Sequence, residues 1–157
     1  MQSMTDRRTP PLLLFVCAGN ICRSPMAQAV AADLVARDGL DVRVESAGMS
    51  ALEGHEATDL TREALAALGL SIDDHRARQL TRELVGDAAL VVTATRRQSD
   101  DLRHFFPADA AKIRSFAELT GLGDLADPYG AGMESFTSLA ALIGKGMPRI
   151  LDALGAR

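Results

Sequence analysis

The sequence is poor in cysteine and in positive charge, and each shortage excludes a class of protein. Two cysteines among 157 residues are too few for a disulfide scaffold, and they show no zinc-ligand spacing. They suit a reducing cytoplasm, where a lone cysteine is a candidate nucleophile. The formal net charge of −4 leaves no basic stripe that would neutralise a series of phosphates. We therefore expect a cytoplasmic protein without a metal, a cofactor or a nucleic-acid partner.

Long hydrophobic runs are also absent. The run Leu12–Val16 follows Arg7 and Arg8, but it is too short for a signal peptide, and no stretch approaches the length of a membrane span. We therefore expect no membrane partner. Residues 1–11 are predicted to form a flexible tail, because Pro10 and Pro11 mark the point where order begins. Residues 12–157 are long enough for a single domain with one core, and we expect a monomer.

Short apolar runs alternate with helical patterns along the rest of the chain. Runs typical of buried strands cover residues 12–16, 42–46, 89–93 and 113–115. Helices are predicted near residues 25–39, 61–68, 96–105 and 136–154, the last one broken by Gly144, Gly146 and Pro148. This alternation predicts an α/β fold, with a parallel sheet and helices on both faces. Ligands of such folds bind beyond the carboxyl ends of the strands, where the loop after residue 16 lies.

The loop Cys17–Ser24 has the composition of an anion-binding site with a nucleophile. Five residues separate Cys17 from Arg23, so the backbone N–H groups between them can turn inward around an anion. The helix that begins near Pro25 adds the positive end of its dipole, and Arg23 can bind two phosphoryl oxygens at once. These groups favour the thiolate of Cys17, and Ser24 can donate its hydroxyl to that sulfur. The loop therefore predicts a metal-free phosphatase.

The phosphate is expected to lie among the residues that follow the nucleophile. These are Ala18, Gly19, Asn20, Ile21, Cys22, Arg23 and Ser24. Gly19 and Asn20 suit the dihedral angles of so tight a loop, because both residue types tolerate a positive φ.

The segment Asp127–Gly130 supplies a candidate for the proton donor that a phosphatase needs, because the leaving oxygen of a phosphate monoester must be protonated. Pro128 stiffens the turn and biases Asp127 toward an extended conformation. Tyr129 can form one wall of a cleft for an aromatic leaving group. An ordinary turn contains the same residue types, so Asp127 is a candidate acid only because Cys17 requires one.

Four segments of the chain resemble the low-molecular-weight protein tyrosine phosphatases. They are Leu14–Pro25, Val44–Gly48, His75–Thr81 and Asp127–Gly130, and the likeness covers nearly the whole chain after residue 11. The resemblance implies a flavodoxin-like sheet of four parallel strands. It also implies a cysteinyl-phosphate on Cys17, with Arg23 clamping the phosphoryl group and Asp127 acting first as acid and then as base. The implied partner is a phosphotyrosine protein or a small aryl phosphate.

The resemblance further assigns residues that support the loop and line the cleft. The implied support is a set of hydrogen bonds that holds the loop in a strained shape, formed by Asn20, Ser24, Ser46 and His75. The chain departs from the family's pattern at Thr93–Gln98 and at Ser50–Glu53, where an aromatic wall residue is common. The wall is therefore expected to consist of Tyr129 and Leu52, and both departures bear on substrate preference.

Cys22 follows Cys17 by five residues in the same curled loop, so a disulfide between the two is geometrically possible. We expect this disulfide to form reversibly under peroxide and to protect Cys17 from irreversible oxidation.

Related activities stay open. An arsenate reductase that relays a disulfide needs further cysteines, and none follows Cys22, which leaves a version that uses an external small thiol. Phosphoarginine phosphatases resemble this chain but carry threonine where Ile21 stands, so Ile21 favours phosphotyrosine. A catalytically inactive phosphate-binding module is disfavoured, because Cys17, Arg23 and Asp127 are all present.

Overall fold

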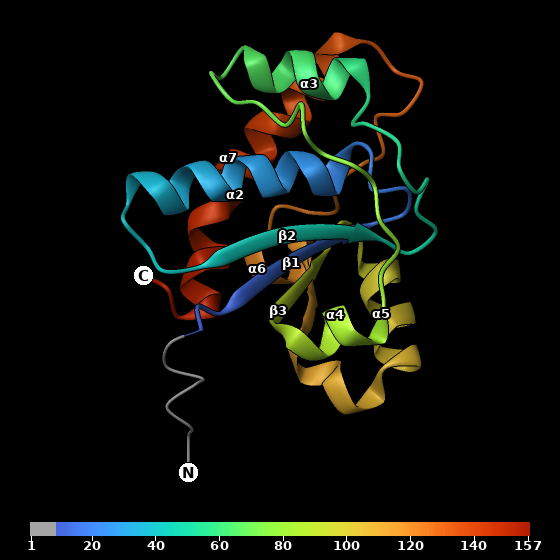
Figure 1. The fold of residues 1–157 in the computed structure, drawn as a ribbon, viewed down its shortest axis with the longest axis vertical. Helices are drawn as coiled ribbons and strands as arrows, with labels where there is room; N and C mark the ends of the chain where they lie inside the picture. Colours follow the sequence, from blue (N-terminus) through green and yellow to red (C-terminus); the bar gives the residue numbers. More distant parts are fainter. Residues whose placement is uncertain (1–8) are drawn as a thin grey trace.

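The core of the protein is one parallel sheet of four strands (Figure 1). A computed structural model describes residues 9–157, so most of the predicted tail, residues 1–8, lies outside the described residues. The strands are β1 (Leu12–Cys17), β2 (Arg43–Gly48), β3 (Ala88–Thr93) and β4 (Ile113–Ser115), and they pair in the order β2-β1-β3-β4. All three pairings are parallel. The predicted flavodoxin-like α/β fold is therefore confirmed.

Helices cover both faces of the sheet, as Figure 1 shows. One face carries α2 (Arg23–Arg37), α6 (Phe116–Thr120) and α7 (Met133–Leu154), and α3 (Asp59–Ala66) packs against α7 and α2 farther from the sheet. The other face carries α4 (Arg82–Asp87) and α5 (Arg96–Phe105), and the 3-10 helix η1 (Pro107–Lys112) follows α5. The sequence pattern missed α4, η1 and α6, because helices of five or six residues are too short to display a helical period.

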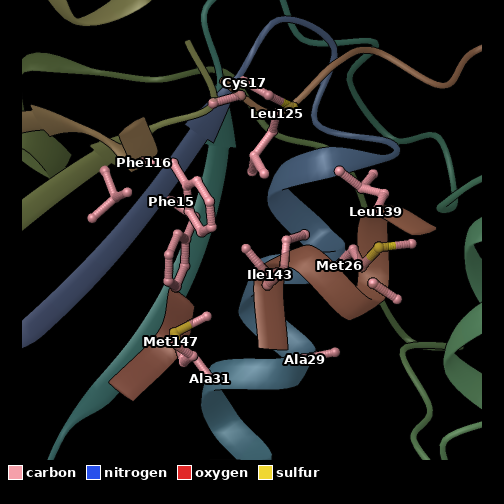
Figure 2. Close-up of a cluster of buried hydrophobic side chains, with 14 of the residues drawn as sticks. Phe15, Cys17, Met26, Ala29, Ala31, Phe116, Leu125, Leu139, Ile143 and Met147 are labelled. Atoms are coloured by element: carbon pink, nitrogen blue, oxygen red, sulfur yellow. The ribbon is translucent and has the colours of Figure 1, made fainter. Parts of the chain in front are cut away.

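Strand β1 is buried along its whole length and contributes to two separate hydrophobic clusters. Leu13 and Phe15 belong to the cluster under α2 and α7, whereas Leu14 and Val16 belong to the cluster under α4 and α5. Successive side chains of a strand point to opposite faces, so a continuous apolar run is what a strand between two helical layers requires. Figure 2 shows the first cluster, in which Phe15 lies near residues of α6 and α7.

Helix α7 runs unbroken to Leu154, so the break predicted at Gly144, Gly146 and Pro148 is wrong. Gly146 instead permits close packing against α6, because a Cβ there would lie 2.6 Å from Cζ of Phe116. Pro148 removes one N–H from the helix. The burial of one face of α7 outweighs that loss. The buried face consists of Phe136, Leu139, Ala140, Ile143, Met147, Ile150 and Leu151.

The order of the strands places the loop after β1 at the point where the direction of strand addition reverses. The chain adds β2 on one side of β1 and then adds β3 and β4 on the other side. In sheets of this kind, ligands bind in the crevice at that reversal, outside the carboxyl ends of the strands. The loop between Cys17 and Arg23 lies there and leads directly into α2.

Residues 9–157 lack two kinds of feature. No helix among them is both long enough and apolar enough to cross a membrane. No group of three or more His, Cys, Asp or Glu side chains in the same range is arranged to hold a metal ion.

Candidate active site

The loop between β1 and α2 turns its carbonyl groups away from the cleft. Each carbonyl from residue 17 to residue 22 accepts a hydrogen bond of 2.8–3.1 Å from a residue beyond the loop. The donors, in order of the carbonyls, are Met49 N, Ser50 N, Leu52 N, His75 Nε2, Thr58 N and Met26 N. The carbonyl and the N–H of a peptide group point in opposite directions. Outward carbonyls therefore leave the N–H groups of the loop on the inner side.

The N–H groups of residues 18–24 belong to the loop in which the sequence predicts an anion site. None of them donates to an acceptor within residues 9–157, so they remain available to a ligand. Successive free N–H groups in a curled loop create a concave site for an anion. The first turn of α2 lies at the end of the same loop and adds the positive end of its dipole. This arrangement suits the oxygens of a phosphoryl group.

Two residues allow the backbone to take this shape, and one predicted residue does not. Asn20 has φ 61°, the one positive value for a non-glycine residue among residues 9–157. Gly19 has no positive φ, so its predicted role in the turn is wrong. Sequence reasoning missed Gly48 at the end of β2, where a Cβ would lie 2.6 Å from the carbonyl oxygen of Ala18. Glycine at this position lets β2 approach the loop closely.

The buried side chain of Asn20 orients the hydroxyl groups around the nucleophile. Its Oδ1 accepts the N–H of Arg78 at 3.0 Å, so its Nδ2 can only donate. Nδ2 donates to Ser24 Oγ at 2.8 Å and to Ser46 Oγ at 3.0 Å. Because Ser24 Oγ accepts this hydrogen bond, it can donate its own hydrogen to Cys17 Sγ, 2.9 Å away, which is nearer than its other acceptor, the carbonyl oxygen of Ala47 at 3.5 Å. Ser24 can therefore stabilise a thiolate at Cys17.

The remaining support of the loop comes from α2, from β2 and from the segment between α3 and α4. His75 donates its Nε2–H to the carbonyl oxygen of Asn20 at 2.8 Å. Burial lowers the pKa of His75, although the hydrogen bond to Asn20 opposes that shift. Ser46 donates to Gln28 Oε1 at 2.6 Å, and Arg78 Nε donates to the carbonyl of Ser46 at 3.0 Å. Sequence reasoning missed Gln28 and Arg78, because a polar residue on a helix or beside a loop is usually a surface residue.

Arg23 connects the loop to the candidate acid. Its side chain is almost completely buried, and Nη1 donates to the carbonyl oxygen of Leu125 at 3.0 Å. Nη2 lies 3.8 Å from Asp127 Oδ2. The side chain of Asp127 is 56% exposed, and its Oδ1 accepts the N–H of Tyr129 at 3.1 Å. The structure thus brings the predicted phosphate clamp and the predicted acid together at the mouth of one cleft.

The cleft above Cys17 has a volume of about 260 Å³ and is mainly apolar at its sides. Ile21, Leu52 and Tyr129 form these sides, and Tyr129 is 68% exposed. Leu52 thus occupies the wall position predicted for it in the departing segment 50–53. The other departing segment, 93–98, does not line the cleft but ends β3 and begins α5, where Thr95 caps the helix through a capping box with Gln98.

Cys22 lies on the same loop as the nucleophile, and both cysteines are buried free thiols. Cys22 Sγ lies 3.5 Å from Thr58 Oγ1. Burial raises the pKa of Cys22, against the opposing effect of the hydroxyl groups of Thr58 and Thr61. The Cys22 thiol is therefore protonated at neutral pH and is a poor nucleophile until it loses that proton.

Known proteins are similar to this chain in sequence and in fold. Residues 12–157 match the family described as low molecular weight phosphotyrosine protein phosphatase. The chain is 38% identical over 147 residues to a probable low molecular weight protein-tyrosine-phosphatase, EpsP, of Ralstonia nicotianae, with 91% of this chain and 97% of that protein covered. It is 36% identical over 126 residues to a protein-arginine-phosphatase of Bacillus subtilis, with coverage of 79% and 83%. A solved structure of the arginine phosphatase YwlE with a phosphorylated active-site serine matches with a TM-score of 0.86 and 31% identity, covering 92% of this chain and 95% of that chain.

Proposed function

Because the chain belongs to the low-molecular-weight phosphotyrosine protein phosphatase family, we propose that it hydrolyses phosphotyrosine in proteins through a phosphocysteine at Cys17. Membership makes the chain a hydrolytic enzyme. The observation that carries the proposal is the outward orientation of the carbonyls of residues 17–22, which turns the N–H groups of residues 18–23 inward beside Cys17. These groups can bind the phosphoryl oxygens more strongly as negative charge grows on them in the transition state.

In the first step, the thiolate of Cys17 attacks the phosphorus atom in line with the leaving oxygen. The S–P bond forms while the P–O bond breaks, and Asp127 gives its proton to the leaving oxygen, so tyrosine departs as a neutral phenol. Arg23 and the loop N–H groups bind the other three oxygens. The structure of YwlE with a phosphorylated active-site serine supports a covalent phosphoenzyme in this chain as well.

In the second step, water attacks the phosphorus of the phosphocysteine. Asp127, now a carboxylate, takes a proton from the water as the S–P bond breaks. The hydrogen bond from Ser24 to Cys17 Sγ stabilises the departing thiolate. The products are inorganic phosphate and the free enzyme.

The walls of the cleft favour an aromatic ester. Ile21, Leu52 and Tyr129 offer apolar surface to a phenyl ring whose phosphate lies on the loop. Burial of about 100 Å² of ring surface contributes about 2.5 kcal/mol at about 25 cal/mol per Å². We therefore expect kcat/KM for an aryl phosphate to exceed that for an alkyl phosphate of equal charge by about 70-fold.

Phosphoarginine is the second candidate substrate, because the chain is similar to a protein-arginine-phosphatase. The two candidates separate in one assay, in which the same peptide carries either phosphotyrosine or phosphoarginine. We expect the higher kcat/KM for phosphotyrosine, since the apolar side chain of Ile21 offers no hydrogen bond to a guanidino group. Arsenate reduction that depends on an added small thiol is the remaining alternative, and it is measured in the same preparation.

Redox sensitivity is a further part of the proposal. Peroxide would oxidise the Cys17 thiolate to a sulfenic acid with release of hydroxide, and the Cys22 thiol would then condense with it, forming a disulfide and water. The reaction suits a reducing cytoplasm, where we place the protein, because a thiol can reverse it there.

Substitution of the two reacting residues tests the proposed mechanism. Cys17→Ser should abolish the hydrolysis of p-nitrophenyl phosphate, and Asp127→Ala should slow it by about 10²–10⁴-fold while phosphate still binds. Asp101→Ala, which removes an exposed acid from α5, is the matched control and should leave the rate unchanged. Turnover should also survive EDTA. Full activity of the Cys17→Ser protein would refute the proposal.

A further inference from the structure

The segment 124–127, which carries Asp127, is attached to the end of β3 through Leu125. The N–H of Leu125 donates to the carbonyl of Ala94 at 2.9 Å, and its carbonyl accepts Nη1 of Arg23 at 3.0 Å. The side chain of Leu125 is 3% exposed and lies in the cluster below Cys17 (Figure 2). Leu125 therefore holds the segment at one point of the sheet's edge.

Leu125 anchors the segment before Asp127, and the buried Pro128 anchors it after Asp127, but the two residues between these anchors are open to solvent. Ala126 is exposed, and Asp127 is more than half exposed. The contacts of the Asp127 carboxylate are the N–H of Tyr129 in its own turn and Arg23 at 3.8 Å. A carboxylate that must deliver a proton to one oxygen atom needs a better defined position than these contacts provide.

Asp124 provides a further point of attachment, on the N-terminal side of Leu125. Its Oδ1 accepts the backbone N–H of Arg96 at 3.0 Å. Arg96 is the first residue of α5, so its N–H has no partner within the helix. A carboxylate at this position also lies at the positive end of the helix dipole. The bond thus ties the segment to a rigid element beside β3.

We propose that Asp124 is a positioning residue for the general acid. Its bond to α5 and the attachment of Leu125 to β3 together fix the direction in which the chain runs to Asp127. This inference rests on the proposed role of Asp127. Asp124 does not line the cleft and does not touch the substrate, so it acts only through the position of Asp127.

The acidity of the leaving group gives a readout that a merely structural role would not move. A misplaced acid slows the ester whose leaving oxygen needs the proton, phenyl phosphate, more than p-nitrophenyl phosphate, whose phenolate leaves readily. We expect Asp124→Ala to lower kcat/KM for phenyl phosphate by about tenfold or more, within the range that a displacement of about 1 Å produces. Its kcat/KM for p-nitrophenyl phosphate should fall by a smaller factor, and its inhibition by inorganic phosphate should change little. Asp124→Asn, which keeps the acceptor oxygen, should retain most of the parent kcat/KM for phenyl phosphate.

The donor can be removed independently, because the bond uses a backbone N–H. Arg96→Pro deletes that N–H at the first helical position, where proline is well tolerated. Thr95 has φ −130° and ψ 157°, which suits the residue before a proline. Arg96→Pro should reproduce the leaving-group effect of Asp124→Ala, and the double variant should show no further loss. Asp101→Ala is the matched control on α5.

The outcomes separate the two proposals. If Asp127→Ala slows both esters equally, the role of Asp127 as acid is wrong and the inference fails with it. If Asp127→Ala shows the leaving-group effect but Asp124→Ala slows both esters equally or neither, Asp127 remains the acid and the positioning role of Asp124 is refuted. Additive losses in the double variant would also refute it.

Discussion

Replacement of Gly48 by alanine tests whether the shape of the anion loop depends on its closest neighbour. The new Cβ would lie 2.6 Å from the carbonyl oxygen of Ala18. Neither partner can easily yield. The N–H of Gly48 donates to the carbonyl of Arg78, and its carbonyl accepts the N–H of Leu80. The carbonyl of Ala18 accepts the N–H of Ser50.

The size of the effect follows from this distance. An unstrained contact needs about 3.5 Å, so the loop and β2 must separate by about 1 Å. A displacement of this size near the reacting atoms lowers kcat/KM by about 100-fold. Overpacking of this kind also costs about 1–3 kcal/mol of stability, which for a chain of this length lowers Tm by about 3–9 °C.

The assay compares Gly48→Ala with Gly86→Ala, in which a Cβ meets nothing within 4 Å. Both proteins are measured for kcat/KM with p-nitrophenyl phosphate, for inhibition by inorganic phosphate and for Tm. We expect weaker phosphate binding, lower kcat/KM and lower Tm for Gly48→Ala alone. A Gly48→Ala protein that binds phosphate and turns over like the parent would refute the claim that this close approach shapes the loop.

Three further predictions concern the helix α7, His75 and Cys22. Gly144→Ala should stabilise the protein by up to about 1 kcal/mol in denaturant unfolding, because a Cβ there meets nothing, whereas Gly146→Ala should destabilise it by about 1–3 kcal/mol; equal effects would contradict the packing of α7 on α6. Burial lowers the pKa of His75 below its ordinary value of 6.5, so the unfolded chain binds this proton more readily and stability should fall as pH drops through and below 6.5. His75→Gln should lose that slope in unfolding curves measured across pH, and unchanged curves would disprove it. Burial raises the pKa of Cys22 above 9.0, so the rate of disulfide closure after peroxide treatment should keep increasing as the pH is raised to 9.0. The loss of free thiol measures this rate. Cys22→Ser should not regain activity with reductant, and full recovery would exclude the protective role.

Local sequence was sufficient for the strands and for the reacting groups. The apolar run of β1 predicted a strand buried on both faces, because alternate side chains belong to two clusters. Cys17, Arg23 and Ser24 lie within eight consecutive residues, so their common loop could be predicted from spacing alone. The pattern of Asp127–Gly130 indicated an acid only through the chemistry that Cys17 requires.

Periodicity misjudged α7 for a physical reason. Gly144, Gly146 and Pro148 weaken a helix in isolation. Their cost is outweighed by the burial of α7 against α2 and α6, which the propensity of single residues does not contain.

The sequence by itself determined the chemistry of this protein, whereas the tertiary structure decided which residues hold that chemistry in place. Backbone N–H groups of Met49, Ser50, Leu52 and Thr58 donate to the outward carbonyls, and Asp124 meets the N–H of Arg96 across 28 positions of the chain. Each is a single hydrogen bond between distant segments, and a hydrogen bond to the backbone makes no demand on the identity of the residue that supplies the N–H. Such contacts leave no periodic pattern or fixed spacing in the sequence, and only the packed fold brings their atoms within bonding distance.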